Sequence, residues 1–334
     1  MKNHNTNLDL LRVVSAFAVI WLHVSAGIAT TNPDVSSFAW WTGNVADAFS
    51  RWCVPVFVMI SGALLLANPA NSSPLPFYQK RAARLLVPIA FWSVIYLIYR
   101  AYSETGFTWG VAAKSVVTGA PYFHLWYLYM VIGLYLFAPF LRALVSALTP
   151  KALGLLVLLC LTLAAIDMLL EGQRSTFLTW FIPYIGYFVA GYYLLNQGDG
   201  WRGRKLALIF LICGLFIAAV TALLYPMIGS RSWNLMYHYL NPFVAIMAIC
   251  LFLLLAKKVE LRPIPMALVN LLAPLSFGIY LIHPLWMRVL DKLAITGFLF
   301  HPLFGIPAMT LSAFALSALT AAMLLKIPFL RRTI

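Results

Sequence analysis

The residues with the clearest chemical potential lie in the first long apolar segment of the chain. Arg12 and His23 interrupt this segment with ten residues between them. In an α-helix this spacing leaves the two side chains about 20° apart in rotation and roughly 16 Å apart along the axis. Histidine, with an unperturbed pKa of about 6.5, can take a proton from a hydroxyl or carry an acyl group near neutral pH. A structural interpretation explains the pair equally well when it is taken alone. In that interpretation Arg12 reaches the lipid headgroups and His23 forms a hydrogen bond with a neighbouring helix.

The second apolar segment carries two short patterns. Asp47 lies four residues before Arg51, the order and spacing that favour an ion pair within one helix, and we interpret this pair as structural. Ser61 and Gly62 permit the close approach of a backbone, which could belong to another helix or to a ligand. The local sequence does not separate these two interpretations.

Two more histidines lie in apolar segments further along the chain. His124 and Trp126 begin the fourth segment, where they could contact a substrate near the outer surface or simply lie at the interface. Ser276, Tyr280 and His283 fall within about 40° of one another on a helical wheel. They predict a second inward polar face that also carries a histidine.

A basic cluster of Lys80, Arg81 and Arg84 precedes the third apolar segment. Residues three and four apart share a helix face, so these side chains can act together. Guanidinium groups match phosphate oxygens, which would suit a nucleotide-bearing substrate. The same placement is also an ordinary topology signal and by itself requires no ligand.

The elements that must position all these residues are transmembrane helices. Of the 334 residues, 63% are hydrophobic and only 10% are charged, a composition that a soluble domain could not accommodate. The apolar runs have the length of helical spans and lack the alternation of barrel strands. We therefore expect an all-α, polytopic bundle forming a single transmembrane domain, residues 1–334. The runs predict ten spans, at about 8–29, 46–67, 84–102, 122–145, 152–170, 177–196, 206–226, 237–256, 271–292 and 303–325.

The net charge of +14 lies mainly in short loops between these runs. With both termini in the cytoplasm, sixteen of the 23 Lys and Arg residues fall on the cytoplasmic side and six on the other, which predicts this orientation. The positions of the basic residues therefore indicate the orientation of the chain in the membrane, and they do not indicate a nucleic-acid-binding surface. We expect a multi-pass protein of the bacterial cytoplasmic membrane whose surroundings are membrane lipids.

Sequence patterns of soluble catalytic and metal sites are absent. The chain contains no HExxH, no GxSxG and no nucleotide-binding Gly-rich loop. The cysteines lie in apolar runs without short spacing, and predict neither a metal cluster nor a disulfide framework. They are Cys53, Cys160, Cys213 and Cys250. We expect no metal site.

The first-span pattern, Arg12 followed after ten residues by His23, resembles the signature of the membrane acyltransferase 3 family. The resemblance continues through Phe57 to Gly62, Arg81 with Arg84, His124-Leu125-Trp126 and Ser276 to His283. It covers essentially the whole chain and agrees with the ten-span plan. The compact length is most similar to stand-alone bacterial enzymes that O-acetylate surface polysaccharides such as enterobacterial common antigen.

This resemblance implies acetyl-CoA, or another acyl-CoA, bound from the cytoplasm, and an acceptor hydroxyl on an extracytoplasmic or lipid-linked glycan. Arg12 and His23 would then be catalytic. The residues implied at the acyl-CoA are Arg12, Lys80, Arg81, Arg84 and Ser61. Those implied at the acceptor are His124, Trp126, Tyr280 and His283.

One feature departs from the family pattern. His124-Leu125-Trp126 stands where many relatives place an acidic residue in a Ser-Leu-x-x-Glu-like stretch, so no carboxylate partner for His23 is identified. The alternative function is a transporter that exports a glycan or an acylated metabolite along the same polar faces. The absence of a visible inverted repeat weighs against it.

Overall fold

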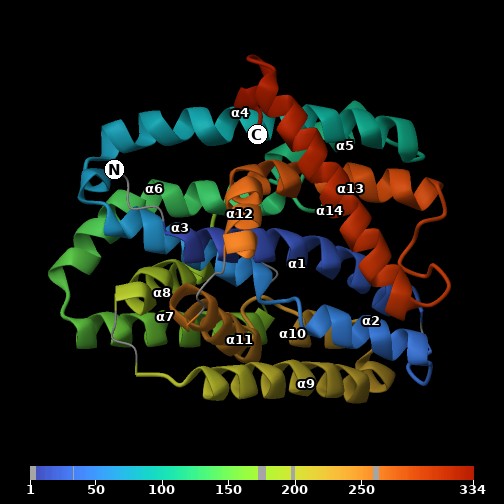
Figure 1. The fold of residues 1–334 in the computed structure, drawn as a ribbon, viewed down its shortest axis with the longest axis horizontal. Coiled ribbons are helices and arrows are strands. Elements are labelled where there is room, and N and C mark those ends of the chain that lie inside the picture. The colour runs from blue at the N-terminus through green and yellow to red at the C-terminus, as the bar shows by residue number, and fades with distance from the viewer. Residues whose placement is uncertain (1–4, 33, 172–177, 197–199, 259–262) are drawn as a thin grey trace.

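The structure, a computed structural model, describes residues 5–32, 34–171, 178–196, 200–258 and 263–334. These residues form helices joined by turns and contain no strand (Figure 1). Among them, eight helical segments are long and apolar enough to cross a membrane by length and composition. The predicted all-α, polytopic membrane bundle is therefore confirmed.

Six of the eight segments are single helices and two are pairs of consecutive helices. The single helices are α1 (Thr6–Thr31), α4 (Pro74–Ser103), α6 (Trp126–Ala147), α7 (Pro150–Glu171), α9 (Gly203–Ile228) and α14 (Pro302–Lys326). The pairs are α2 (Phe38–Ala48) with α3 (Cys53–Ala67), and α12 (Pro263–Leu272) with α13 (Ser276–Lys292). Shorter helices connect them: α5 (Trp109–Val117), α8 (Ile185–Asn196), α10 (Arg231–Met236) and α11 (Pro242–Leu253).

Two of the ten predicted spans contain only short helices in the described residues. The span at 177–196 contains α8 after a 3-10 turn at Ile182–Tyr184, and its first residue lies outside the described residues. The span at 237–256 contains α11, which continues into a π-helical turn, η3 (Leu254–Lys258). The count of ten and the location of the termini stay predictions.

Three predicted spans begin or break differently in the structure, and prolines explain two of these differences. A continuous helix over 46–67 is wrong, because the chain turns between Ala48 and Cys53; Pro55 has no N–H to offer and its ring would clash with the carbonyl four residues back. A 3-10 turn containing Pro274 likewise separates α12 from α13. The fourth span begins at Trp126, so His124 lies in the preceding turn.

Helices α3 and α8 approach each other closely, backbone against backbone. A Cβ added to Gly62 would lie 1.7 Å from the carbonyl oxygen of Phe188, and one added to Gly191 would lie 1.9 Å from that of Met59. The Ser61 hydroxyl donates to the Phe57 carbonyl of its own helix at 3.0 Å. The backbone that approaches the small pair is therefore that of another helix.

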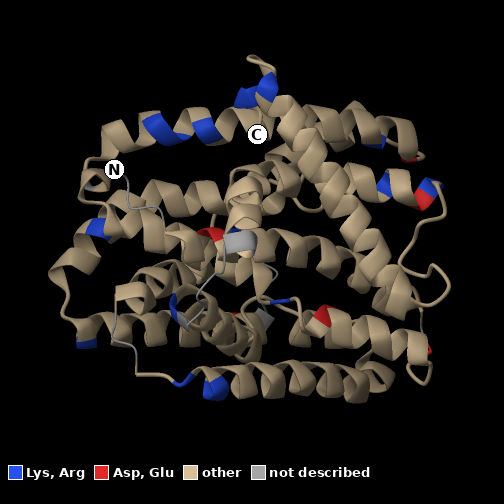
Figure 2. Cartoon of the chain, viewed as in Figure 1, with Lys and Arg blue, Asp and Glu red and all other residues tan. Residues whose placement is uncertain are grey.

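Helix α1 lies near the centre of the bundle in Figure 1 and packs against α2, α3, α13 and α14. Figure 2 shows Lys and Arg residues near the ends at which α4, α7 and α9 begin and near the C-terminus. These ends correspond to the cytoplasmic face in the orientation predicted from charge. The central helix thus runs from the more basic end of the bundle to the opposite end, which we call the outer end.

Candidate active site

Three histidines from different parts of the chain meet inside the outer half of the bundle. His23 lies on α1, His124 in the turn before α6, and His283 on α13. The rings of His23 and His283 stack, with centroids 5.4 Å apart and planes 11° apart. The His124 and His283 centroids are also 5.4 Å apart, with an angle of 75° between the planes. We call these three residues the histidine cluster; it joins the two polar faces that the sequence predicted separately.

Tyr280 and its neighbours hold two members of the cluster in place. The Tyr280 hydroxyl donates a short hydrogen bond to the carbonyl oxygen of His124. The carbonyl oxygen of Tyr280 lies 2.7 Å from Nδ1 of His283. Because a carbonyl can only accept, Nδ1 of His283 carries the proton, and in a neutral ring Nε2 is then an acceptor. Nε2 is buried and has no hydrogen-bond partner in the described part of the chain.

The three histidine side chains differ in how exposed they are. His124 and His283 are 2% and 0% exposed, and Tyr96 packs against the ring of His124 with a centroid distance of 4.9 Å. His23 is only partly buried, with Phe123 against its ring at 4.8 Å. The described residues contain no group of three His, Cys, Asp or Glu side chains that could hold a metal ion. His23 is therefore the accessible member of the cluster.

His23 borders two cavities. A narrow cavity of about 20 Å³ is shared with Cys53, His124 and Tyr280, and has room for about one water molecule. An outer cavity of about 440 Å³ extends from His23 between α1, α13 and the α13–α14 connection. Arg288 and Asp291 lie on its rim, with Nη1 and Oδ2 3.6 Å apart. A small reacting group can therefore reach the His23 ring.

Arg12 lies on the same unbroken helix as His23, as the spacing predicted. Its Nη1 donates to Oδ1 of Asp9 at 2.8 Å, and the Arg12 side chain is 35% exposed. This end of α1 packs against η3 and α12, and Asn7 donates to the Ala256 carbonyl at 3.2 Å. The structure thus gives Arg12 a carboxylate partner on its own helix, which the sequence analysis did not consider.

The basic cluster on α4 occupies a different part of the bundle. Lys80 and Arg84 are exposed, whereas Arg81 is partly buried with its guanidinium 5.5 Å from the centre of the Phe77 ring. Helix α4 packs against α6 and the C-terminal turn η5 (Leu330–Arg332). Trp92 of α4 donates to the Thr333 carbonyl at 2.8 Å, so the C-terminal turn contacts α4 beyond the basic cluster.

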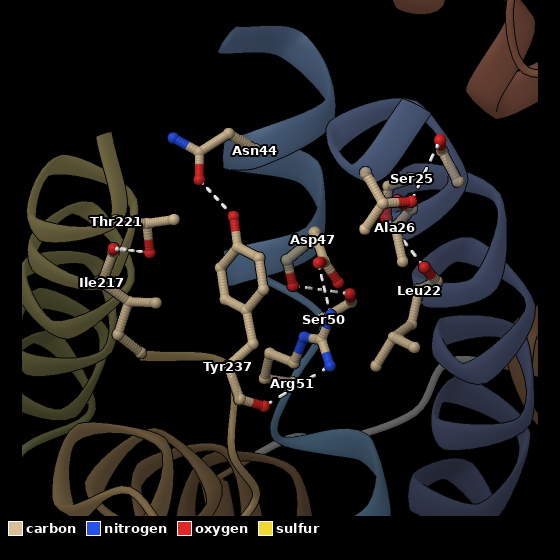
Figure 3. A network of polar contacts seen from close by, with 12 residues as sticks. Leu22, Ser25, Ala26, Asn44, Asp47, Ser50, Arg51, Ile217, Thr221 and Tyr237 are labelled. Carbon is tan, nitrogen blue, oxygen red and sulfur yellow. Dashed lines mark hydrogen bonds and ion pairs between the residues drawn. The ribbon is translucent and has the colours of Figure 1, made fainter. Parts of the chain in front are cut away.

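A buried polar network surrounds the break between α2 and α3 (Figure 3). Arg51 and Asp47 form the ion pair that the sequence predicted, with side chains 13% and 1% exposed. The Arg51 guanidinium lies 4.5 Å from the centre of the Tyr237 ring and donates to the Tyr237 carbonyl at 3.4 Å. The Tyr237 hydroxyl in turn donates to Asn44. The ion pair thus links the broken second span to the α10–α11 connection.

A second cavity at the outer end has mainly aromatic walls. It has a volume of about 480 Å³ and includes Arg51 and Trp126. We call it the aromatic pocket, and its other principal lining residues are Asp167, Trp180, Tyr184, Trp233, His238 and Tyr239. Of all these, the sequence analysis assigned a substrate contact only to Trp126. The dense aromatic stretch at 233–239 was the available signal for the rest.

Comparison with known proteins identifies the family of the chain. The sequence pattern of the acyltransferase 3 family, described as an acyltransferase domain, matches residues 5–322. No curated protein and no solved structure gives a significant match. With nearly the whole chain matched, and with helices able to cross a membrane, this protein belongs to the acyltransferase 3 family of membrane acyltransferases.

Proposed function

We propose that the protein transfers an acetyl or other acyl group from cytoplasmic acyl-CoA to a hydroxyl of an extracytoplasmic or lipid-linked glycan, in the bacterial inner membrane. The observation that carries this proposal is the position of His23. It lies on the central helix, at the edge of the histidine cluster, with its ring open to two cavities. The same helix carries Arg12 toward the basic end of the bundle.

The reaction assigned to His23 is proton transfer during acyl transfer. As the acceptor oxygen attacks the thioester carbonyl, His23 would take the hydroxyl proton, and the C–S bond would break. The products are an O-acyl ester and free CoA thiol, which receives the proton from the imidazolium. A positioned general base contributes roughly 10²- to 10⁴-fold to such a step.

The buried histidines support this role without contacting the reacting groups. His283 presents its ring face to His23, and its Nδ1 bond to Tyr280 fixes its orientation. Tyr280 also holds the His124 turn. Because His283 and the His124 turn are both fixed, they define the position of the His23 ring. Positioning of a catalytic group in this way contributes a large part of the rate of an enzyme.

The donor side is supported by the basic residues on α4. Lys80, Arg81 and Arg84 lie at the predicted cytoplasmic end of the bundle, two of them exposed. Their charges suit the phosphates of CoA. We propose that they guide the nucleotide part of the donor, while Arg12 lies closer along α1 to the reacting thioester.

The decisive experiment compares purified wild-type protein in lipid nanodiscs with His23→Ala. Radiolabelled acetyl-CoA is supplied together with the glycan fraction released from a strain that lacks the gene, and both ester formation and free thiol are measured. We expect the variant to lose at least about 100-fold in rate, on the scale of a general base. His301→Asn is the matched control, because His301 caps α14 at the outer surface through its Nδ1, and Asn can keep that cap.

A folded His23→Ala variant with the wild-type rate would refute the proposed role of His23. If wild-type protein moved the glycan across a membrane without releasing CoA thiol, the transporter alternative would replace the enzyme. Kinetics with both substrates varied separate direct attack from an acyl-histidine intermediate, because only the latter gives a ping-pong pattern.

A further inference from the structure

The aromatic pocket is built around Trp126. The ring of Trp126 lies 5.8 Å from that of Tyr239, with planes 21° apart, and 6.3 Å from that of Trp180. The centroid of the Tyr184 ring lies 6.1 Å from that of Trp126, with the planes tilted by 50°. The faces of pyranose rings carry C–H groups, which pack well against the electron-rich faces of aromatic side chains. A pocket walled in this way therefore suits a sugar ring.

Two residues that line the pocket also carry buried N–H groups without a partner among the described residues. Nε of Arg51 and Nε1 of Trp233 are both buried N–H donors with no partner among the described residues. A buried donor without a partner costs roughly 1–3 kcal/mol. Sugar hydroxyls and ring oxygens accept such bonds, and so would a water molecule in their absence. Arg51 and Trp233 therefore add polar groups to an aromatic lining, and a carbohydrate site combines both kinds of group.

The charges around the pocket favour a neutral sugar. The guanidinium of Arg51 is already compensated by Asp47. Asp167 places an additional, exposed carboxylate in the lining. A uronic or sialic acid would bring another negative charge toward this carboxylate, and like charges repel. Among pyranoses, neutral hexoses and N-acetylhexosamines avoid this cost.

The pocket adjoins the histidine cluster directly. Trp126 and Tyr239 line both the aromatic pocket and the narrow cavity that contains His23 and His124. The two spaces are thus separated by one pair of stacked rings. A sugar in the aromatic pocket would therefore lie on the other side of these two rings from the narrow cavity that His23 borders.

We infer that the aromatic pocket is the acceptor subsite and that it binds a neutral pyranose unit of the glycan. This inference rests on the proposed function, since it assigns the acceptor of that reaction a place. Its volume of about 480 Å³ falls within the range of roughly 300–1,000 Å³ that small-molecule sites occupy. The outer cavity, although it touches His23, lacks these aromatic walls.

The test measures acceptor and donor KM separately in pocket variants. The glycan released from a strain lacking the gene is divided by anion exchange into neutral and acidic fractions, and each is offered with radiolabelled acetyl-CoA. For Trp180→Ala and Trp233→Ala we expect the KM of the neutral fraction to rise about 10-fold, the scale of one aromatic contact, with the KM for acetyl-CoA within about twofold. Trp180→Phe should keep most of the affinity because it keeps a ring.

Two controls test the location. Trp109→Ala removes an exposed tryptophan of α5 and should change neither KM. Gly27→Leu places a side chain in the outer cavity, where a Cβ at Gly27 meets no atom within 4 Å; it too should leave the acceptor KM unchanged.

Three results would overturn the subsite and leave the proposed function standing. They are an unchanged acceptor KM in both pocket variants, acylation of the acidic fraction alone, or a raised acceptor KM in Gly27→Leu but not in the pocket variants. Failure of the wild-type protein to acylate either fraction would instead refute the proposed function itself, and the subsite with it.

Discussion

The imidazoles of His23 and His283 lie parallel, with their centroids 5.4 Å apart, although they belong to helices at opposite ends of the chain. His283 is fully buried and its Nδ1 bonds the Tyr280 carbonyl, whereas His23 is partly exposed. One ring is therefore fixed and the other is available. We therefore propose a positioning role for His283, while the acceptor contact that the family resemblance implied stays a prediction.

The first prediction concerns this stacked pair. His283→Ala should lower kcat by about 10- to 100-fold, because a displaced catalytic group costs rate at this scale, and should leave the KM for acetyl-CoA within about twofold. His283→Phe retains a flat ring under His23 and should recover most of the loss. Steady-state kinetics on folded protein measure both values. An unchanged kcat in His283→Ala would show that His23 needs no such support.

The second prediction concerns the buried ion pair of Asp47 and Arg51. Asp47→Asn leaves the Arg51 charge without its partner, and breaking a buried pair costs about 3–5 kcal/mol. Thermal unfolding in detergent should show a large fall in midpoint. The double variant Asp47→Leu with Arg51→Met removes both charges and should recover much of the stability. A single variant as stable as wild type would mean that water solvates the guanidinium.

The third prediction concerns the donor-side cations. Lys80→Gln and Arg84→Gln should each raise the KM for acetyl-CoA roughly 2- to 5-fold, the scale of an exposed ion pair. The effect should shrink as salt is added, since exposed charges are screened. Lys205→Gln, an exposed lysine at the start of α9, serves as the control and should change little. Equal effects from all three variants would indicate a general surface-charge effect.

The fourth prediction concerns the crossing of α3 and α8. Gly62→Ala and Gly191→Ala each place a methyl group within 2 Å of a carbonyl oxygen on the facing helix, so the helices must separate. Overpacking usually lowers the free energy of unfolding by about 1–3 kcal/mol. Because the methyl group meets backbone atoms, we expect a loss at or above the upper end of this range. Gly27→Ala on α1 meets open space and should be neutral or slightly stabilising. Unfolding midpoints of the three proteins check this contrast.

Several features of the structure could be predicted from local spacing in the sequence. Long apolar runs predict membrane helices, because only helices or closed barrels satisfy the backbone in lipid. The Arg12–His23 face follows from the helical period, and α1 is continuous through both residues. The Asp47–Arg51 pair likewise follows from i, i+4 spacing and survives although a turn begins between its members.

Features that depend on how helices meet could not be predicted in this way. The sequence analysis placed His23, His124 and His283 on separate segments, and their convergence depends on the packing of α1 and α13 and on the turn before α6. The count of ten spans treated α8 and α11 as full helices of the same kind as the others, whereas the structure has them shorter.

The sequence by itself determined the class of fold, the family resemblance and the residues able to do chemistry, since these follow from composition and from periods within one helix. Only the tertiary structure decided which histidine is accessible and which partners Arg12 and Arg51 have. It also decided that aromatic residues from the start of α6, the turns before α8 and the α10–α11 region surround one pocket. The physical reason is that such contacts depend on interhelical distance and rotation. The distances and rotations are set where helices cross, as at Gly62 and Phe188. The periodicity of a single helix contains no information about such crossings.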